Sequence, residues 1–177
     1  MITPEENYKI RIAEPKDSEN VCDLVNSVYR GDNAKKGWTT EADLLEGIRI
    51  DINKVNEIIS SENNVLLLIT DQDKVIGSVH LEKKGSKCHL GMLSVDVNYQ
   101  NRGIGRLLMD KSEEYAKTEF RCNKMEMKVI GQRKELIDYY LRRGYEITGE
   151  KEPFIVNSHF GAPKAAGLYF EYMVKIL

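Results

Sequence analysis

The segment 87–108 contains the pattern that most restricts how this chain can fold. Residues 87–95 (KCHLGMLSV) have the length and apolar character of a β-strand. Gly103 and Gly105 follow a short polar connection and stand at the start of an amphipathic helical pattern. A strand that leads through a glycine-containing turn into such a helix favours a layered fold, in which helices cover a sheet.

The rest of the chain predicts one sheet with helices packed on it. Apolar runs or alternation predict strands over 7–12, 65–70, 75–82, 125–130 and 168–176. Helical spacing predicts a helix capped by Asp17, a helix after a capping box at Thr40-x-x-Asp43, and helices over 52–59 and 134–143, the last ended by Gly144. Residues 29–39 have loop composition. The order indicates a mixed α/β or α+β fold, and the lack of a linker predicts a single domain over 1–177.

Charge and composition exclude several classes of protein. Lys and Arg number 26 and Asp and Glu number 28, so the net charge of −2 argues against a nucleic-acid-binding protein. No stretch approaches the roughly 20 apolar residues of a membrane span, and the N-terminus lacks the features of a signal peptide. Three widely spaced cysteines fit neither a disulfide framework nor a metal clip, which favours a cytoplasmic location.

The turn at 100–105 has the composition of a phosphate site. Glycines let a ligand approach the backbone, and the first turn of a helix has unpaired N–H groups and the positive end of the helix dipole. Gln100, Arg102 and Arg106 add side-chain donors. The alternative is that the two glycines only shape a tight turn. Neither the dinucleotide-binding fingerprint nor the Walker A motif is present.

Two motifs together resemble those of the GNAT-superfamily N-acetyltransferases. Gln100-x-x-Gly103-x-Gly105 after a strand is similar to the acyl-CoA-binding motif of this family. The stretch 136–145 (LIDYYLRRGY) resembles its second motif, a helix that ends in Tyr-x-x-x-Gly-Phe/Tyr. The order of elements matches along essentially the whole chain. Residues 29–31 and 37–41 are similar to one subgroup of the family, which by itself indicates no acceptor.

The resemblance implies a GNAT-like fold and acetyl-CoA as the acyl donor. The sheet is expected to be mostly antiparallel with helices on both faces, and strands 87–95 and 125–130 to be parallel and to splay apart. Pantetheine would pair with the backbone of Leu93 and Val95. The Val95 N–H would polarise the thioester carbonyl. Arg133 stands where many members have Asn. Its guanidinium is expected to contact the CoA phosphates or a substrate carboxylate, and the alternative is a solvated charge near the first turn of a helix. The expected cofactor-binding residues are Leu93, Ser94, Val95, Gln100, Asn101, Arg102, Gly103, Ile104, Gly105, Arg106 and Arg133.

The resemblance also suggests an acid and a base for the transfer. Tyr140, four residues before Gly144, matches the Tyr that protonates the departing thiolate, and a phenol with a pKa near about 10 stays protonated at neutral pH. The alternative is an aromatic residue that only packs. His89 is the candidate base, and its alternative is a cross-strand histidine without a chemical role. His80 and Glu82 on the preceding strand are further candidates.

The first helices and their loop commonly form the acceptor pocket in this family. The expected acceptor-binding residues are Tyr29, Arg30, Trp38, Thr39 and Glu41. Three of them have an alternative: Trp38 anchors the loop, Glu41 complements a helix dipole, and Arg30 is solvated. The loop 153–163, with Asn157, Ser158 and His159, is expected to close over the acceptor. The three histidines are scattered, so no catalytic metal is expected.

The sequence therefore predicts an acetyl-CoA-dependent N-acetyltransferase. The acceptor would be a primary amine of a small molecule or peptide, which attacks directly in a ternary complex. The alternative is an acyl-CoA-binding sensor or partner subunit without turnover. A homodimer is expected from the resemblance and from the frequency of two-fold dimers.

Overall fold

The computed structural model describes residues 8–156 and 161–177. Its strands are β1 (Tyr8–Ile12), β2 (Leu45–Glu46), β3 (Asn64–Asp71), β4 (Lys74–Lys84), β5 (Lys87–Val95), β6 (Lys124–Ile130), β7 (Glu146–Pro153), β8 (Ala162–Pro163) and β9 (Tyr169–Ile176). Its helices are η2 (Pro15–Asp17), α1 (Ser18–Tyr29), α2 (Gly31–Ala34), α3 (Ile52–Ser60), η3 (Val97–Tyr99), α4 (Ile104–Thr118) and α5 (Lys134–Arg142).

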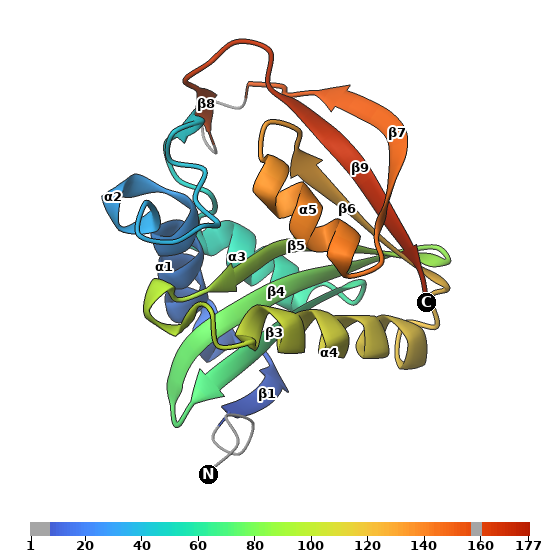
Figure 1. Cartoon of the computed structure of the whole chain (residues 1–177). Coiled ribbons are helices and arrows are strands. Elements are labelled where there is room, and N and C mark those ends of the chain that lie inside the picture. The colour runs from blue at the N-terminus through green and yellow to red at the C-terminus, as the bar shows by residue number, and fades with distance from the viewer. Residues whose placement is uncertain (1–7, 157–160) are drawn as a thin grey trace.

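Seven strands form one mixed sheet in the order β1-β3-β4-β5-β6-β9-β7. Figure 1 shows this sheet with α4 and α5 in front of it and α1 and α3 behind it. One core cluster joins α4 and α5 to the sheet, and a second joins α1 and α3 to its opposite face. The predicted mixed sheet with helices on both faces is confirmed. No described helix is long and apolar enough to cross a lipid bilayer.

The parallel pair β5–β6 opens a gap in the sheet. Its register covers only three pairs, Lys87 with Lys124, Cys88 with Met125 and His89 with Glu126. On its other side, β5 continues to pair with β4 as far as Val95, after a register shift and a positive φ of 49° at Met92. Residues 90–95 of β5 therefore have an unpaired edge toward β6. The predicted splay of the two strands is confirmed.

The predicted helix after Thr40 is wrong. Residues 42–44 form a turn, and Leu45 and Glu46 form β2, which pairs with β8. The Thr40 hydroxyl accepts a hydrogen bond from the Ala42 N–H at 3.1 Å, which is a local turn contact two residues along the chain. Residues 31–34, predicted as loop, form the short helix α2.

Asp17 occupies the N-cap position of α1, but its side chain does not cap that helix. Its carboxylate instead accepts hydrogen bonds from the Arg11 guanidinium at 2.7 and 2.8 Å and from the Glu14 N–H at 2.8 Å. The hydrogen bond from Arg11 lowers the pKa of Asp17. The predicted end of the 134–143 helix is confirmed, since Gly144 follows the cap residue with a φ of +88°.

Candidate functional site

The last residues of β5 turn backbone groups toward the gap in the sheet. The Asp96 N–H donates to the Ile76 carbonyl at 2.8 Å, so the next pair, Gly77 with Val95, is a non-hydrogen-bonded pair of the β4–β5 ladder. The N–H and C=O of Val95 therefore point away from β4, toward the splayed edge. An extended ligand in the gap would meet this N–H as a strand would.

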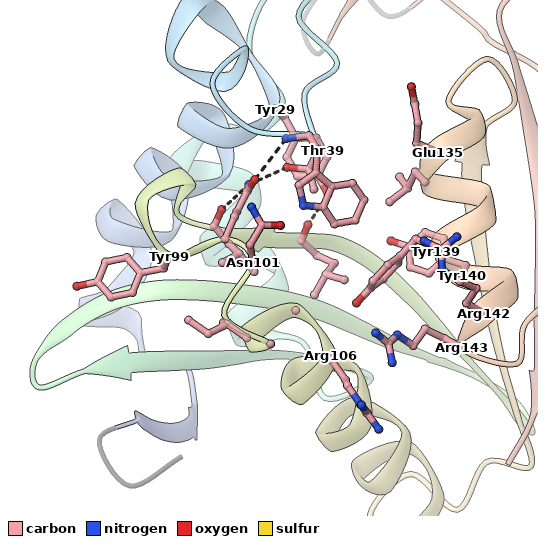
Figure 2. Close-up of a pocket in the computed structure, with 18 residues that line it drawn as sticks. Tyr29, Thr39, Tyr99, Asn101, Arg106, Glu135, Tyr139, Tyr140, Arg142 and Arg143 are labelled. Carbon is pink, nitrogen blue, oxygen red and sulfur yellow. Dashed lines mark hydrogen bonds between the residues drawn. The ribbon is translucent and has the colours of Figure 1, made fainter. Parts of the chain in front are cut away.

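Two carbonyls on this edge are already bound by side chains from other elements. The Tyr29 hydroxyl donates to the Leu93 carbonyl at 2.7 Å, and the Gln100 amide donates to the Val95 carbonyl at 3.1 Å (Figure 2). Gln100 also accepts from the Trp38 N–H at 3.3 Å. A Cβ at Gly37 would lie 2.8 Å from the Gln100 amide nitrogen. Gln100 therefore holds segment 37–39 against the end of β5, and its amide is engaged there.

The turn before α4 presents free N–H groups. Asn101 and Gly103 have φ of +61° and +79°, and no atom lies within 4 Å of a Cβ built on Gly103. The first backbone bond of α4 joins the Leu107 N–H to the Gly103 carbonyl at 2.9 Å. The N–H groups of the preceding helical residues therefore have no helical acceptor, and the helix dipole favours an anion beside them.

A cavity of about 660 Å³ lies between this turn and α5. Figure 2 shows Tyr29 and Thr39 on one side of it and Tyr139, Tyr140 and Arg142 of α5, with the C-cap residue Arg143, across from them. The predicted residues that line this first cavity are Tyr29, Trp38, Thr39, Leu93, Val95, Gln100, Asn101, Gly103, Ile104, Gly105, Arg106 and Tyr140.

The α5 wall of the first cavity contains residues that sequence reasoning missed. Glu135, Tyr139, Arg142 and Arg143 line it, as does Tyr99 from the turn. The three α5 residues and the C-cap residue Arg143 are spaced i, i+4, i+7 and i+8. This spacing places them on one helical face and is the signal that was available in the sequence.

Tyr139 lies in this wall. Its ring centroid is 5.1 Å from that of Trp38, and the Arg143 guanidinium lies over it at 5.1 Å. Its hydroxyl would be 3.6 Å from a Cβ at Gly105. The Tyr139 side chain thus spans from α5 to the first turn of α4.

A second cavity, of about 270 Å³, is lined by residues of both β5 and β6. Its lining residues are Tyr29, Glu41, Arg49, His89, Leu90, Gly91, Met92, Leu93, Met127, Lys128, Val129, Ile130, Arg133, Leu136, Tyr140 and Phe170. The two cavities share Tyr29, Leu93, Leu136 and Tyr140. These four residues therefore mark the place where ligands in the two cavities would meet.

Tyr140 lies at this junction with a hydroxyl that is not engaged elsewhere. The residue is 6% exposed, and no described residue hydrogen-bonds to its hydroxyl. Burial raises the pKa of Tyr140, so that the phenol stays protonated. Burial also raises the pKa of Tyr29 to about 12.

His89 lies in the second cavity as a neutral imidazole. Burial lowers the pKa of His89 to about 4. A neutral imidazole is the form that accepts a proton. The other basic candidates, His80 and Glu82, line neither cavity; they contact Asn64 at 2.6 Å and Lys84 at 3.0 Å, respectively.

Two buried arginines hold Glu41 beside the second cavity. The Arg30 guanidinium contacts one carboxylate oxygen at 2.6 Å, and the Arg133 guanidinium contacts the other at 3.6 Å. Arg133 also donates to the Trp38 carbonyl at 3.5 Å. The structure thus places Arg133 with the second cavity and away from the Gly103 turn, whereas Arg30 lines neither cavity.

The remaining predicted residues lie away from both cavities or outside the described residues. Ser94 is buried and its hydroxyl donates to the Met92 carbonyl at 3.0 Å. Arg102 is exposed and lies over the Tyr99 ring at 5.1 Å. The loop residues Asn157, Ser158 and His159 are outside the described part of the chain. Within that part, no group of His, Cys, Asp and Glu residues has the arrangement of a metal site.

Comparisons with known proteins agree with the geometry. The sequence matches the model of the Acetyltransferase (GNAT) family over residues 24–145. Comparison with curated proteins finds no significant match.

Several solved structures share the fold at low sequence identity. An acetyltransferase of the GNAT family from Streptococcus pneumoniae is 20% identical, with a TM-score of 0.68 over 96% of this chain and 99% of the other. The ribosomal-protein-S18-alanine N-acetyltransferase from Escherichia coli is 12% identical, with a TM-score of 0.71 over 96% and 93%. Mutant forms of the spermidine/spermine N-acetyltransferase from Vibrio cholerae are 15% identical, with a TM-score of 0.68 over 96% and 94%.

Proposed function

Because the chain belongs to the GNAT acetyltransferase family, we propose that it transfers an acetyl group from acetyl-CoA to a primary amine of a small molecule or peptide. One observation carries the proposal: a free strand edge and a free helix N-terminus border one cavity, which meets a second cavity at Tyr140. This arrangement gives the acyl donor and the acceptor separate places that share one junction.

The residues of the first cavity fit acetyl-CoA. The free N–H groups at the start of α4 suit a pyrophosphate, and the space at Gly103 lets phosphate oxygens reach the backbone. The open edge of β5 suits the extended, amide-containing pantetheine arm. Arg106, Arg142 and Arg143 line the same cavity and supply positive charge for phosphates.

When bound, acetyl-CoA supplies an activated acyl carbon and a thiolate leaving group. The Val95 N–H, turned toward the gap, is proposed to donate a hydrogen bond to the thioester carbonyl oxygen. His89 would take the proton that the attacking amine releases, as the new N–C bond forms. Tyr140 would give a proton to the sulfur as the C–S bond breaks. His89 then releases its added proton to solvent, and Tyr140 takes a proton from solvent.

The other site assignments follow from the same division into two cavities. Trp38 and Thr39, predicted as acceptor-binding, are proposed to wall the cofactor, because they line the first cavity. Arg133 and Glu41 are proposed to face the acceptor, because they line the second. Arg30 is proposed to position Glu41.

A pair of substitutions of equal size at Gly103 tests the cofactor site. Asn and Asp adopt a positive φ more readily than other non-glycine residues, and a Cβ at Gly103 (φ +79°) meets no atom within 4 Å, so both variants carry the same backbone strain, but only Asp brings a negative charge to the phosphate position. We expect acetyl-CoA and CoA to raise the unfolding free energy of the wild type by about 2.7 kcal/mol at 100 times Kd. Gly103→Asn should keep most of this stabilisation and Gly103→Asp should lose it, whereas ATP alone should have no effect in a thermal unfolding assay.

The outcomes separate the proposal from its alternatives. If neither acetyl-CoA nor CoA stabilises the wild type, the acetyltransferase proposal fails. If both stabilise it but a broad amine panel releases no CoA, the protein is a non-catalytic acyl-CoA-binding module instead. A homodimer and a cytoplasmic location stay predictions from the sequence.

A further inference from the structure

The second cavity is lined by more positive than negative side chains. Its charged lining residues are Glu41, Arg49, Lys128 and Arg133, which makes three cations and one carboxylate. His89 adds no charge at neutral pH, since burial keeps it neutral. The cavity that is proposed to hold the acceptor therefore has an excess of positive charge.

The single carboxylate is not available to an ammonium group. Both of its oxygens are engaged, one by Arg30 at 2.6 Å and the other by Arg133 at 3.6 Å. A polycationic amine in this cavity would meet unpaired positive charge and no free carboxylate among the described lining residues, which disfavours its binding.

Arg49 is the lining cation that lacks a carboxylate partner among the described residues. Lys128, by contrast, pairs with Glu152 at 2.9 Å. The Arg49 guanidinium lies over the Tyr29 ring, 5.7 Å from its centroid. Its backbone is fixed, because the Arg49 N–H donates to the Asn26 side chain at 2.7 Å. Arg49 thus places a guanidinium against the Tyr29 ring at the cavity, and its donor edge has no hydrogen bond or ion pair among the described residues.

We propose that the acceptor is an amine that also carries a carboxylate, and that Arg49, which lines the second cavity together with Arg133, binds that carboxylate. The inference rests on the proposed acetyl transfer and names the class of its acceptor. A guanidinium matches the two oxygens of a carboxylate with two parallel N–H donors. A ligand held in this way keeps its amine free to reach the junction at Tyr140.

The experiment compares amines that differ only in the carboxylate. CoA release is measured for the twenty amino acids and for their amides, with spermidine, spermine and phosphoethanolamine alongside. Each kcat/KM is calculated from the concentration of the unprotonated amine, so that differences in amine pKa do not affect the comparison. At least one amino acid should have a kcat/KM more than about tenfold above that of its amide. Arg49→Gln should raise KM for this acceptor and reduce the ratio toward one, and Arg49→Lys should keep part of it. Lys36→Gln, which removes an exposed positive charge outside both cavities, should leave the ratio unchanged.

Each other outcome overturns the inference. Equal or faster turnover of amides or polyamines would do so, as would a ratio that Arg49→Gln does not change. Preference for phosphoethanolamine would replace the carboxylate by a phosphate. If acetyl-CoA binds but no amine is acetylated, thermal unfolding of the CoA complex tests the inference instead. The inference fails when carboxylated amines stabilise this complex no more than their amides do. Absence of acetyl-CoA binding would instead refute the proposed function.

Discussion

Tyr140 combines a position at the junction of the two cavities with a hydroxyl that no described residue engages. Removing that hydroxyl should leave the fold intact, because the ring continues to pack between Tyr139 and Tyr145 at centroid distances of 5.5 and 6.0 Å. We expect Tyr140→Phe to lower kcat by about 10² or more, with little change in KM for acetyl-CoA, as initial rates would show.

Tyr115→Phe is the matched control, since the Tyr115 ring packs on Phe120 outside both cavities. It should have the kcat of the wild type. A Tyr140→Phe variant with wild-type kcat would assign the proton transfer to another group.

Two histidines make stability depend on pH in the weakly acidic range. Burial lowers the pKa of both His80 and His89 to about 4, against about 6.5 in an unfolded chain. Between these values the unfolded state binds more protons, so the unfolding free energy is fully retained at pH 7 and falls as the pH drops from about 6.5 toward about 4. We expect a loss of up to about 5 kcal/mol between pH 7 and pH 4.5 in urea titrations.

His89→Gln isolates one of these contributions. It should reduce the slope of stability against pH over the same range, whatever its effect on stability at pH 7. If the unfolding free energy of the wild type is constant from pH 7 to pH 4.5, both imidazoles have the same pKa in the folded and in the unfolded chain.

At the scale of single residues, the sequence predicted which residues lie near the first cavity better than it predicted the contacts of each side chain. The glycines of the turn from Gln100 to Gly105 predict a ligand site, and most residues of this turn line the first cavity. Gln100 was expected to be a donor to the ligand, but its amide is bound to the Val95 carbonyl and to segment 37–39. Segment 37–39 lies about sixty residues before Gln100 in the chain, and no local sequence pattern encodes such a contact.

Among the elements, segment 37–39 depends on Gln100 for its place over the first cavity. The Gln100 side chain contacts this segment and the end of β5 at once, and Trp38 then packs on Tyr139. Removal of the amide would leave the Val95 carbonyl without that donor and free the segment. We expect Gln100→Ala to cost about 1–2 kcal/mol of unfolding free energy and to speed hydrogen exchange of residues 37–39 in particular.

Gln100→Glu provides the comparison, because it keeps the acceptor for the Trp38 N–H but loses the donor to Val95. It should give an intermediate increase in exchange at residues 37–39. Unchanged exchange in Gln100→Ala would mean that the stacking of Trp38 on Tyr139 alone holds the segment.

Local patterns succeeded where local forces decide the structure and failed where distant contacts do. The helix end at Gly144 follows from a backbone preference of glycine, and the structure has that conformation. The capping box at Thr40 was a sound local pattern, yet the chain pairs Leu45 and Glu46 with β8, more than a hundred residues later. Burial of Glu41 against Arg30 also holds this segment in a non-helical path.

Across the whole molecule, the two cavities predict direct transfer between two bound substrates. No described Cys or Ser lines either cavity, and burial raises the pKa of Cys88 to about 12, so no thiolate is available there to carry the acetyl group. Initial-rate plots should therefore intersect, as expected for a ternary complex. Parallel lines, or an acetylated protein seen by mass spectrometry after incubation with acetyl-CoA alone, would contradict this.

The overall architecture was predictable from the order of strands and helices, and the parallel pair from the resemblance to a family. The position at which β5 and β6 separate was not, because it depends on the register shift and the positive φ at Met92. Nor was the division of the site into two cavities, since it arises from α5 and β5 converging at Tyr140. Arg49, in particular, belongs to no motif and reaches the second cavity only through tertiary structure.

The gap between β5 and β6 also bears on aggregation. An unpaired strand edge at the surface of a sheet invites pairing with another protein chain. Here the free edge of residues 90–95 lies within the sheet, between two strands and beneath α5 (Figure 1). A slender molecule can enter along such an edge, but a polypeptide strand would have to bring its side chains past the walls of both cavities. The same placement that reserves the edge for a ligand thus protects the protein from self-association through it.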